Sequence, residues 1–339
     1  MTASVALAVD GGSSKTDLAL VDVDGALLAL VRGPTTSPHQ VGLDECVRLL
    51  EGLLAQAMAA AGLTGPHPVA EVGHVMIAGA DLPMEEKALQ DAIAQQGWAA
   101  RTAVSNDTFA VLRAGTERGW GVAVVCGAGI NCVDVSPDGH HARFPSLGAI
   151  TGDWGGGDDV GMAALSAAAR SEDGRGPKTT LERLVPAHFG LSTPRELAEA
   201  IHLGRIAGRR VLELAPVVLA EADTDATAGE IVDRLAGEIV AFARVAATRL
   251  QLTGAPLEVV LGGGLMQAAN GRLQGAISEG LRAVGPEVVA RVVLSPPIVG
   301  AALLALDDLG AGPEAQARLR EELGAAMTRL AERQEEPVG

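Results

Sequence analysis

The sequence predicts an α/β fold in which one structural unit occurs twice. The first copy starts with VALAVDGGSSKTDLALVDVDGALLAL (residues 5–30), which reads as an apolar strand, a Gly-rich turn, a middle strand, an Asp-Gly hairpin and a third strand. The same order returns in GVAVVCGAGINCVDVSPDGHHARF (residues 121–144). Helical periodicity and further apolar strands follow both meanders. Two such ordered repeats indicate a duplication, and a chain of 339 residues has room for two domains.

The first half is expected to alternate strands and helices. Its expected strands cover residues 5–9, 17–23, 26–31, 74–80 and a short stretch that reaches Val104. A helix over 43–61 is predicted from leucines at helical spacing, and Pro83 opens another helix whose first turn is acidic. Ser105–Asp107 are capping residue types at the point where the next helix begins.

The second half is predicted to be mainly helical. Its expected helices lie near residues 160–170, 179–187, 197–200, 205–222, 226–252 and 300–309. Buried strands are expected over 257–264 and 288–295, with a helix between them. The polar run 171–180 is predicted to be a loop between helices, its role open.

The domain boundaries follow from this order. We expect a first domain at 1–115, completed by the helix over 298–310, and a second domain with helical insertions at 116–297. An acidic peripheral helix and a frayed tail are expected over 311–339.

Composition narrows the range of functions. The formal charge is −16 and the chain has only four Phe, three Trp and no Tyr, which disfavours nucleic-acid binding. Local glycine turns can still bind the phosphates of a nucleotide. The three cysteines form neither a CxxC pair nor a disulfide pattern. No apolar stretch is long enough for a membrane span and no basic region precedes the first strand, so a cytoplasmic protein is expected.

The first glycine turn places one of only three lysines, Lys15, after two glycines and two serines. A P-loop needs glycine before its lysine and a helix after it, but here Ser14 precedes Lys15 and the following residues alternate as a strand. The stretch is therefore predicted to be a strand-to-strand hairpin in which Gly11 and Gly12 let a ligand approach the backbone. The N–H, hydroxyl and ammonium donors for a phosphate would come from Ser13, Ser14, Lys15 and Thr16. The alternative is a plain hairpin that uses glycine for a positive φ.

The second glycine turn, Gly127-Ala128-Gly129, stands at the equivalent point of the repeat. Two such hairpins facing each other would form a nucleotide site that neither forms alone. Asp10 ends the first strand, where it could hold Mg²⁺ directly or through water, or else only cap the turn.

A third glycine run, Gly262-Gly263-Gly264, ends a buried strand and begins a helix. This side-chain-free surface would suit an adenine ring and ribose, although close packing of helix and strand is the alternative. The run lacks the G-x-G-x-x-G spacing, which disfavours a Rossmann dinucleotide site.

Together these motifs resemble the actin–hsp70–sugar kinase superfamily. The stretches AGAD, SND, CGAGIN, PDG and GDWGGG are similar to its branch of N-acetylglucosamine kinases and BadF/BadG/BcrA/BcrD ATPases, and the similarity runs in order from about residue 5 to 305. GDWGGGDDVG with SEDGRGPKT and HFG resembles actinobacterial kinases of glucosamine or N-acetylglucosamine. The resemblance implies two ribonuclease H-like (actin-like ATPase) domains, that is, duplicated ββαβα-type units around a central cleft. It also implies ATP and Mg²⁺ as cofactors.

The resemblance also implies roles for single residues. Asp107 matches the family's catalytic base, which accepts the proton of the sugar hydroxyl. Asn106, Asn131 and Asp153 match residues that contact the sugar. From the residues alone, Asn106 and Asp107 would more often be read as a helix N-cap.

Two positions depart from the family pattern. Trp154 replaces a glutamate beside Asp153, and Ala128 replaces a threonine, which puts hydroxyl contacts there in doubt but leaves backbone N–H donors. Gly79, Ala80 and Asp81 match the loop that closes over the sugar.

The acidic residues near this motif favour glucosamine, whose C2 substituent is an ammonium group. The acids in question are Asp153, Asp158, Asp159, Glu172 and Asp173. N-acetylglucosamine is the alternative, since an acetamide needs an apolar pocket and amide partners. Asp158 and Asp159 could instead be the acidic first turn of a helix.

Other functions remain alternatives. An activator ATPase of the BadF type needs cysteines at a dimer interface for an iron–sulfur cluster, whereas Cys126 and Cys132 lie in predicted strands. A non-enzymatic sugar sensor is also compatible, although no helix-turn-helix precedes the first strand. The expected partners are a small sugar and ATP, without nucleic acid or membrane, and both a monomer and a homodimer are compatible with the sequence.

Overall fold

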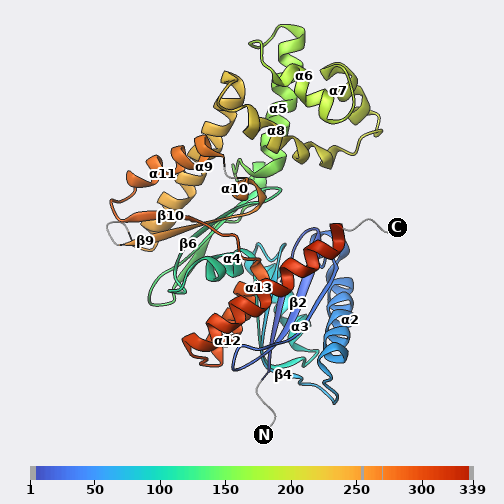
Figure 1. Ribbon diagram of the computed structural model, residues 1–339, viewed down its shortest axis with the longest axis vertical. Coiled ribbons are helices and arrows are strands. Elements are labelled where there is room, and N and C mark those ends of the chain that lie inside the picture. Colours follow the sequence, from blue (N-terminus) through green and yellow to red (C-terminus); the bar gives the residue numbers. More distant parts are fainter. Residues whose placement is uncertain (1–4, 253–255, 269, 336–339) are drawn as a thin grey trace. The chain divides into compact units, whose positions relative to one another are not determined.

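The computed structural model describes residues 5–252, 256–268 and 270–335, coloured along the chain in Figure 1. Residues 336–339, the end of the helix and tail expected over 311–339, lie outside the described residues. The chain divides into two compact units, one of Met1–Gly119 with Leu294–Gly339 and one of Trp120–Val293. We describe each unit by itself.

Unit 1 contains a five-stranded mixed sheet in the order β3-β2-β1-β4-β5. The strands are β1 (Val5–Gly11), β2 (Lys15–Asp22), β3 (Leu27–Pro34), β4 (Ala70–Ile77) and β5 (Ala99–Ser105). β2 pairs antiparallel with both β1 and β3, whereas β4 is parallel to β1 and β5. The three-stranded meander and the two later strands are therefore as the sequence predicts.

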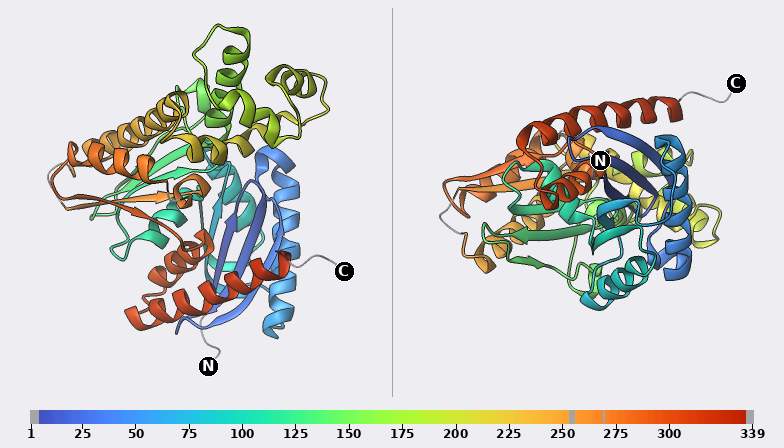
Figure 2. Two further views of the ribbon diagram at one scale, coloured as in Figure 1. Left: turned by 45° about the horizontal axis from the view of Figure 1, so that its top comes forward. Right: turned by 90° about the horizontal axis from the view of Figure 1, so that it is seen from below.

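Alternation along β1 sends side chains to two different layers of unit 1. Leu7 and Val9 pack with α2 (Leu43–Ala61) and α3 (Pro83–Ala94), whereas Ala8 faces a second cluster. That second layer consists of α4 (Thr108–Gly115), α12 (Pro297–Asp308) and α13 (Pro313–Glu335). Figure 2 shows α2 and α13 on opposite sides of the blue strands. A short helix, α1 (Pro38–Val41), precedes α2.

Unit 2 repeats the topology of unit 1. Its sheet has the order β10-β9-β6-β7-β8, with β6 antiparallel to β7 and parallel to β9. The strands are β6 (Gly121–Cys126), β7 (Ile130–Val135), β8 (His141–Arg143), β9 (Leu257–Gly262) and β10 (Val288–Val292). Since β6 occupies the place of β1 and β9 that of β4, the duplication predicted from the two meanders is confirmed.

The helices of unit 2 follow the predicted order with shifted ends. They are α5 (Gly156–Asp173), α6 (Leu181–His188), α7 (Pro194–His202), α8 (Ala215–Glu221), α9 (Ala226–Arg249), α10 (Gly264–Gln267) and α11 (Gly271–Arg282). α5 continues into the expected 171–180 loop as far as Asp173 and is followed by the capping residue Gly174, which has the left-handed conformation.

The single helix predicted over 205–222 is wrong. Residues Gly208–Leu214 form a 3₁₀ segment and α8 starts only at Ala215, with Pro216 in its first turn. Pro216 has no N–H to continue the preceding turn, and its fixed φ suits a helix start.

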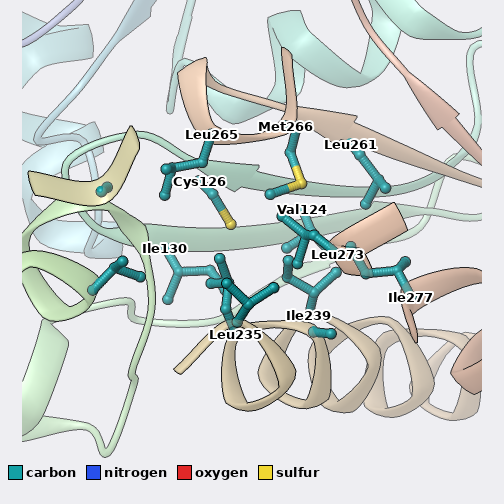
Figure 3. Close-up of a cluster of buried hydrophobic side chains, with 14 of the residues drawn as sticks. Val124, Cys126, Ile130, Leu235, Ile239, Leu261, Leu265, Met266, Leu273 and Ile277 are labelled. Carbon is teal, nitrogen blue, oxygen red and sulfur yellow. The ribbon is translucent and has the colours of Figure 1, made fainter. Parts of the chain in front are cut away.

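The core of unit 2 lies between the sheet and the helices α9 and α11. Figure 3 shows Val124, Cys126 and Leu261 of the strands directed toward Leu235 and Ile239 of α9, all of them buried. This core fixes the ends of β6 and β9, where two of the glycine turns begin. Among the described helices, none combines the length and the apolar character needed to cross a membrane.

Candidate active site

The β1–β2 hairpin of unit 1 carries the first glycine turn. The Gly12 N–H donates to the Lys15 carbonyl at 2.9 Å, and Ser13 and Ser14 form the exposed tip. The chain then continues directly into β2, so no helix follows Lys15 as a P-loop would require. The tip presents hydroxyl and N–H groups to solvent, which a phosphate could use.

Gly11 is required by packing. A Cβ atom there would lie 2.6 Å from Thr36 Oγ1 and 3.2 Å from Ile77 Cγ1. Neither Gly11 nor Gly12 has a positive φ, so the plain-hairpin explanation for these glycines does not hold. At Gly12 a Cβ would lie 3.2 Å from the Lys15 carbonyl oxygen, a close but smaller conflict.

The loop after β3 holds this hairpin in place. Thr35 Oγ1 donates to the Gly12 carbonyl at 2.9 Å, Gln40 Nε2 donates to the Ser13 carbonyl at 2.8 Å, and the Thr16 and Thr36 hydroxyls are 2.9 Å apart. The sequence analysis did not single out this loop. Its only signal was the polar run Thr-Thr-Ser after the third strand.

Asp10 lies in a row of charged residues across the sheet. It stands opposite Asp17 on β2, which stands opposite Arg32 on β3, so the three side chains share one face. Arg32 Nε and Nη2 donate to the two Asp17 oxygens at 2.6 and 2.9 Å. Burial, followed by the charges of Asp107 and Asp17, raises the pKa of Asp10 well above its usual value, while Lys15 and Arg32 act in the opposite direction.

These residues fit a divalent cation at Asp10. The carboxylate is poorly solvated and near two other carboxylates, so a bound cation would favour its ionised form. Carboxylate oxygen is the ligand type that Mg²⁺ prefers.

Asp107 lies between β5 and α4. Burial, followed by the charge of Asp81, raises the pKa of Asp107 to about 6, against the opposing effect of the N–H groups of Asp107 and Thr108. Asp10 pairs with Met76 of β4, and Met76 pairs with Ser105 at the end of β5, so Asp10 and Asp107 lie at or just beyond the ends of parallel strands at the same edge of the sheet. The charge of Asp107 contributes to the raised pKa of Asp10. A half-buried carboxylate with this pKa is suited to accept a proton near neutral pH.

Asn106 is buried and engaged at both ends of its amide. Its Nδ2 donates to Asp81 Oδ1 at 2.8 Å and its Oδ1 accepts from the Thr108 N–H at 3.0 Å. Asn106 thus accepts a hydrogen bond from the first N–H group of α4. Asp107 occupies the N-cap position of this helix, but its side chain makes no capping hydrogen bond.

The predicted sugar-loop residues Gly79 and Ala80 lie just before Asp81. Gly79 has a φ of 95° and faces Ser37 and His39, and Ala80 is fully buried. The turn therefore brings the Asp81 carboxylate to Asn106. The sequence analysis assigns Asp81 to this loop but does not predict its contact with Asn106.

In unit 2, the exposed turn Gly127–Gly129 is joined to the start of α5. The Gly157 and Asp158 N–H groups donate to the Gly127 and Ala128 carbonyls, each at 2.9 Å. Two of the first N–H groups of α5 are thus hydrogen-bonded to the turn and are not available to an anion. A Cβ at Gly127 or Gly129 would meet no atom within 4 Å, so packing within the protein does not require glycine there.

The Gly262–Gly264 run combines two kinds of glycine. Gly263 has a φ of 90°, and a Cβ there would overlap the backbone of Cys126. Gly264 is exposed, and its Cβ position is open space. Close packing of strand and turn thus explains Gly263 but leaves Gly264 unexplained.

Asn131 and Asp153 both belong to unit 2. Asn131 Oδ1 accepts from Ser146 Oγ at 2.7 Å, and Asp153 Oδ2 accepts from Thr151 Oγ1 at 2.5 Å. The adjacent Trp154 packs under the Arg234 guanidinium, 4.0 Å from the ring centroid, at the edge of a cavity of about 560 Å³.

The acidic residues expected to cluster near Asp153 are separated. Asp158 and Asp159 are in the first turn of α5, where Asp159 accepts from the Gly155 N–H at 2.9 Å. Glu172 and Asp173 are at the other end of this helix, roughly 20 Å away at 1.5 Å per residue. Asp173 pairs there with Arg175.

Comparisons with known proteins agree with this architecture. The chain is 30% identical over 215 residues to an N-acetylmuramic acid/N-acetylglucosamine kinase of Clostridium acetobutylicum, covering 62% of this chain and 69% of the relative. It is 24% identical over 204 residues to the N-acetyl-D-glucosamine kinase of Dictyostelium discoideum, covering 58% and 64%. A crystal structure from Chromobacterium violaceum, provisionally described as an N-acetylglucosamine kinase, matches with a TM-score of 0.69 and 26% identity over 90% of this chain and 100% of its own.

The two five-stranded sheets and these matches show the two-domain actin-like ATPase fold. The model of the BadF/BadG/BcrA/BcrD ATPase family matches residues 7–305, and the chain belongs to this family.

Proposed function

We propose that the protein is an ATP-dependent kinase that phosphorylates the 6-hydroxyl of an N-acetylated amino sugar. The observation that carries this proposal is that Asp10 and Asp107 lie at or just beyond the ends of β1 and β5 at one edge of the unit 1 sheet, each with a raised pKa. The names of the two relatives, both kinases of N-acetylated sugars, support the substrate class.

Each carboxylate has a separate role in this proposal. Asp107 accepts the proton of the sugar hydroxyl as the oxygen forms its bond to the γ-phosphorus, while the bond from that phosphorus to ADP breaks. Asp10 is the residue that would hold Mg²⁺, which neutralises charge on the phosphates when bound. The exposed tips Ser13-Ser14 and Gly127–Gly129 are the proposed phosphate contacts, and Gly264 the proposed nucleoside contact.

Asn106, Asn131 and Asp153 remain proposed sugar ligands. Asn106 also holds Asp81 near Asp107, so its first contribution is to the geometry of the base.

The separation of the acidic residues bears on the substrate. The sequence favours glucosamine because four acidic residues follow Asp153, but α5 puts two of them at its far end. The alternative, N-acetylglucosamine, is the better supported substrate because the relatives act on N-acetylated sugars by name.

Steady-state kinetics with N-acetylglucosamine, glucosamine and glucose test this choice. We expect kcat/KM for N-acetylglucosamine to exceed that for glucosamine by about tenfold or more, since an acetamide site leaves polar groups unpaired when the acetyl group is missing. A higher kcat/KM for glucosamine would reverse the substrate assignment. Absence of sugar-dependent ADP formation with all three would contradict the proposed function.

The pH dependence of the reaction tests the role of Asp107. We expect kcat/KM to be nearly constant above pH 7 and to fall as the pH drops through about 6, because the base must be ionised. The raised pKa means that protonating Asp107 favours the folded state. Asp107 therefore contributes fully to the stability of the fold at pH values below the pKa that it has in the unfolded chain. This contribution is lost as the pH rises through about 6.

Because protonating Asp107 stabilises the fold, acid unfolding at this residue does not explain the expected fall in kcat/KM at low pH. Circular dichroism at pH 5.5 and 7.5 provides the control. A profile that stays flat to pH 5 while the fold is intact would exclude Asp107 as the titrating base.

The activator-ATPase alternative has no support from the cysteines. Cys46, Cys126 and Cys132 are all buried, and burial raises the pKa of Cys126 to about 12. Figure 3 shows the Cys126 sulfur directed into the core of unit 2. A cluster ligand at a subunit interface needs an accessible thiolate.

A further inference from the structure

The C-terminal helix α13 lies beyond residues 7–305, the part of the chain that the family model matches. It nevertheless belongs to unit 1, where Figure 1 shows it in red beside α12 and the strands. Leu319 and Leu323 are fully buried in the cluster that includes α12, and the Glu322 carboxylate accepts from the Leu27 N–H at 2.9 Å. α13 is therefore an integral part of this layer.

Arg320 of α13 reaches the last turn of α4. Its Nη1 donates to the Ala114 carbonyl at 2.8 Å, and its Nη2 lies 3.4 Å from the Arg113 carbonyl and 3.5 Å from that of Thr116. The last carbonyls of a helix have no partner within the helix, and a cation there is favoured by the helix dipole. Arg320 thus caps α4 from a different helix.

A second polar contact joins the same three helices. Arg113 of α4 is buried and donates to both oxygens of Asp307 on α12, at 2.7 and 3.0 Å, and to Gln316 Oε1 on α13 at 3.0 Å. Gln316 Nε2 in turn donates to Asp307 Oδ1 at 2.9 Å. Because Gln316 and Arg320 are one helical turn apart, a single face of α13 holds α4.

The other end of α4 carries Asp107. The helix has eight residues, so it is about 12 Å long, and tilting it by about 5° about one end would move the other end by about 1 Å. An error of about 1 Å in a reacting group can reduce the rate on the order of a hundredfold.

We propose that Arg320 is a positioning residue, which holds α4 at its C-terminal end and thereby places Asp107 at its N-terminal end. α13 is then a built-in positioning element for the base. This inference rests on the proposed role of Asp107, and the experiment is chosen to separate the two.

The experiment compares Arg320→Met with Arg318→Met. Arg318 is on the same helix but is half-exposed and forms an ion pair with Glu322 one turn away, so its variant controls for loss of one arginine from α13. For Arg320→Met we expect a fall in kcat of about tenfold or more with the KM for ATP unchanged, because the base is displaced and the nucleotide contacts remain. Arg318→Met should retain both constants.

Hydrogen exchange provides a readout that does not depend on activity. Amides of residues 108–115 should exchange faster in Arg320→Met than in the wild type and in Arg318→Met, because the cap of α4 is lost. Arg320→Lys keeps the cation and should restore part of kcat and of the protection, and it carries the test if Arg320→Met does not fold.

The outcomes are distinguishable. Unchanged kcat, or unchanged exchange of α4, in a folded Arg320 variant would overturn the inference. An equal fall in kcat in Arg320→Met and in Arg318→Met would also overturn it. A wild-type protein without sugar-dependent kinase activity would refute the proposed function, and with it the role of Asp107, whereas the exchange data would still show whether Arg320 holds α4.

Discussion

In the Asp107→Asn variant we expect kcat to fall by about 10²–10⁴-fold, the range that removal of a general base produces. Asparagine has the same size as aspartate but cannot accept the proton of the sugar hydroxyl at neutral pH. The fold should persist, because burial and the charge of Asp81 both disfavour the ionised form of Asp107 in the native protein. The melting temperature at pH 7.5 should therefore be equal to that of the wild type or slightly higher.

ATP binding should also survive this substitution. The charge of Asp107 is one cause of the raised pKa of Asp10, so its removal makes Asp10 easier to ionise and more available to a cation. Calorimetric titration with ATP and Mg²⁺ measures this directly. The matched control is Asp91→Asn, which removes an exposed carboxylate that forms an ion pair with Lys87 on the same helix, α3. A kcat within several-fold of the wild type would show that Asp107 is not the base.

The two meanders and their duplication could be predicted from the sequence. Each meander has its own turn signals, Gly11-Gly12 with Asp24-Gly25 and Gly127–Gly129 with Asp138-Gly139, and the structure gives the two sheets the same strand order. The error at 205–222 had a local cause. Its apolar spacing continues across Pro216, and only the missing N–H of proline divides the segment into a 3₁₀ turn and α8.

The candidate site could be predicted where its functional groups belong to motifs of consecutive residues. Asp107, Asp10 and the glycine turns belong to such motifs. The contacts that hold them do not, because Thr36 reaches Thr16 across 20 positions and Arg320 reaches Ala114 across 206. Such pairs have no periodicity that a single sequence can reveal. The acidic cluster was overestimated for the related reason that closeness in sequence is not closeness in space along a helix.

Gly263 and Gly264 are adjacent, yet alanine is expected to have opposite effects at the two positions. At Gly263 an alanine must take a φ near 90° and its Cβ overlaps the Cys126 backbone. The left-handed backbone costs about 1–2 kcal/mol and the overlap about 1–3 kcal/mol. For a unit of this size we expect the melting temperature to drop by about 5–15 °C.

At Gly264 the expected effect is on the nucleotide and not on the fold. The residue begins α10 and its Cβ position is open, so alanine should leave the melting temperature unchanged or raise it slightly. If the adenosine group lies on this surface, the added methyl group displaces it, and the Kd for ATP should rise about tenfold, equivalent to about 1.4 kcal/mol. Thermal denaturation and ATP titration of both variants give the two readouts. Wild-type ATP affinity in Gly264→Ala would mean that the Gly262–Gly264 run serves the packing of β9 against β6 alone, and that the nucleoside binds elsewhere.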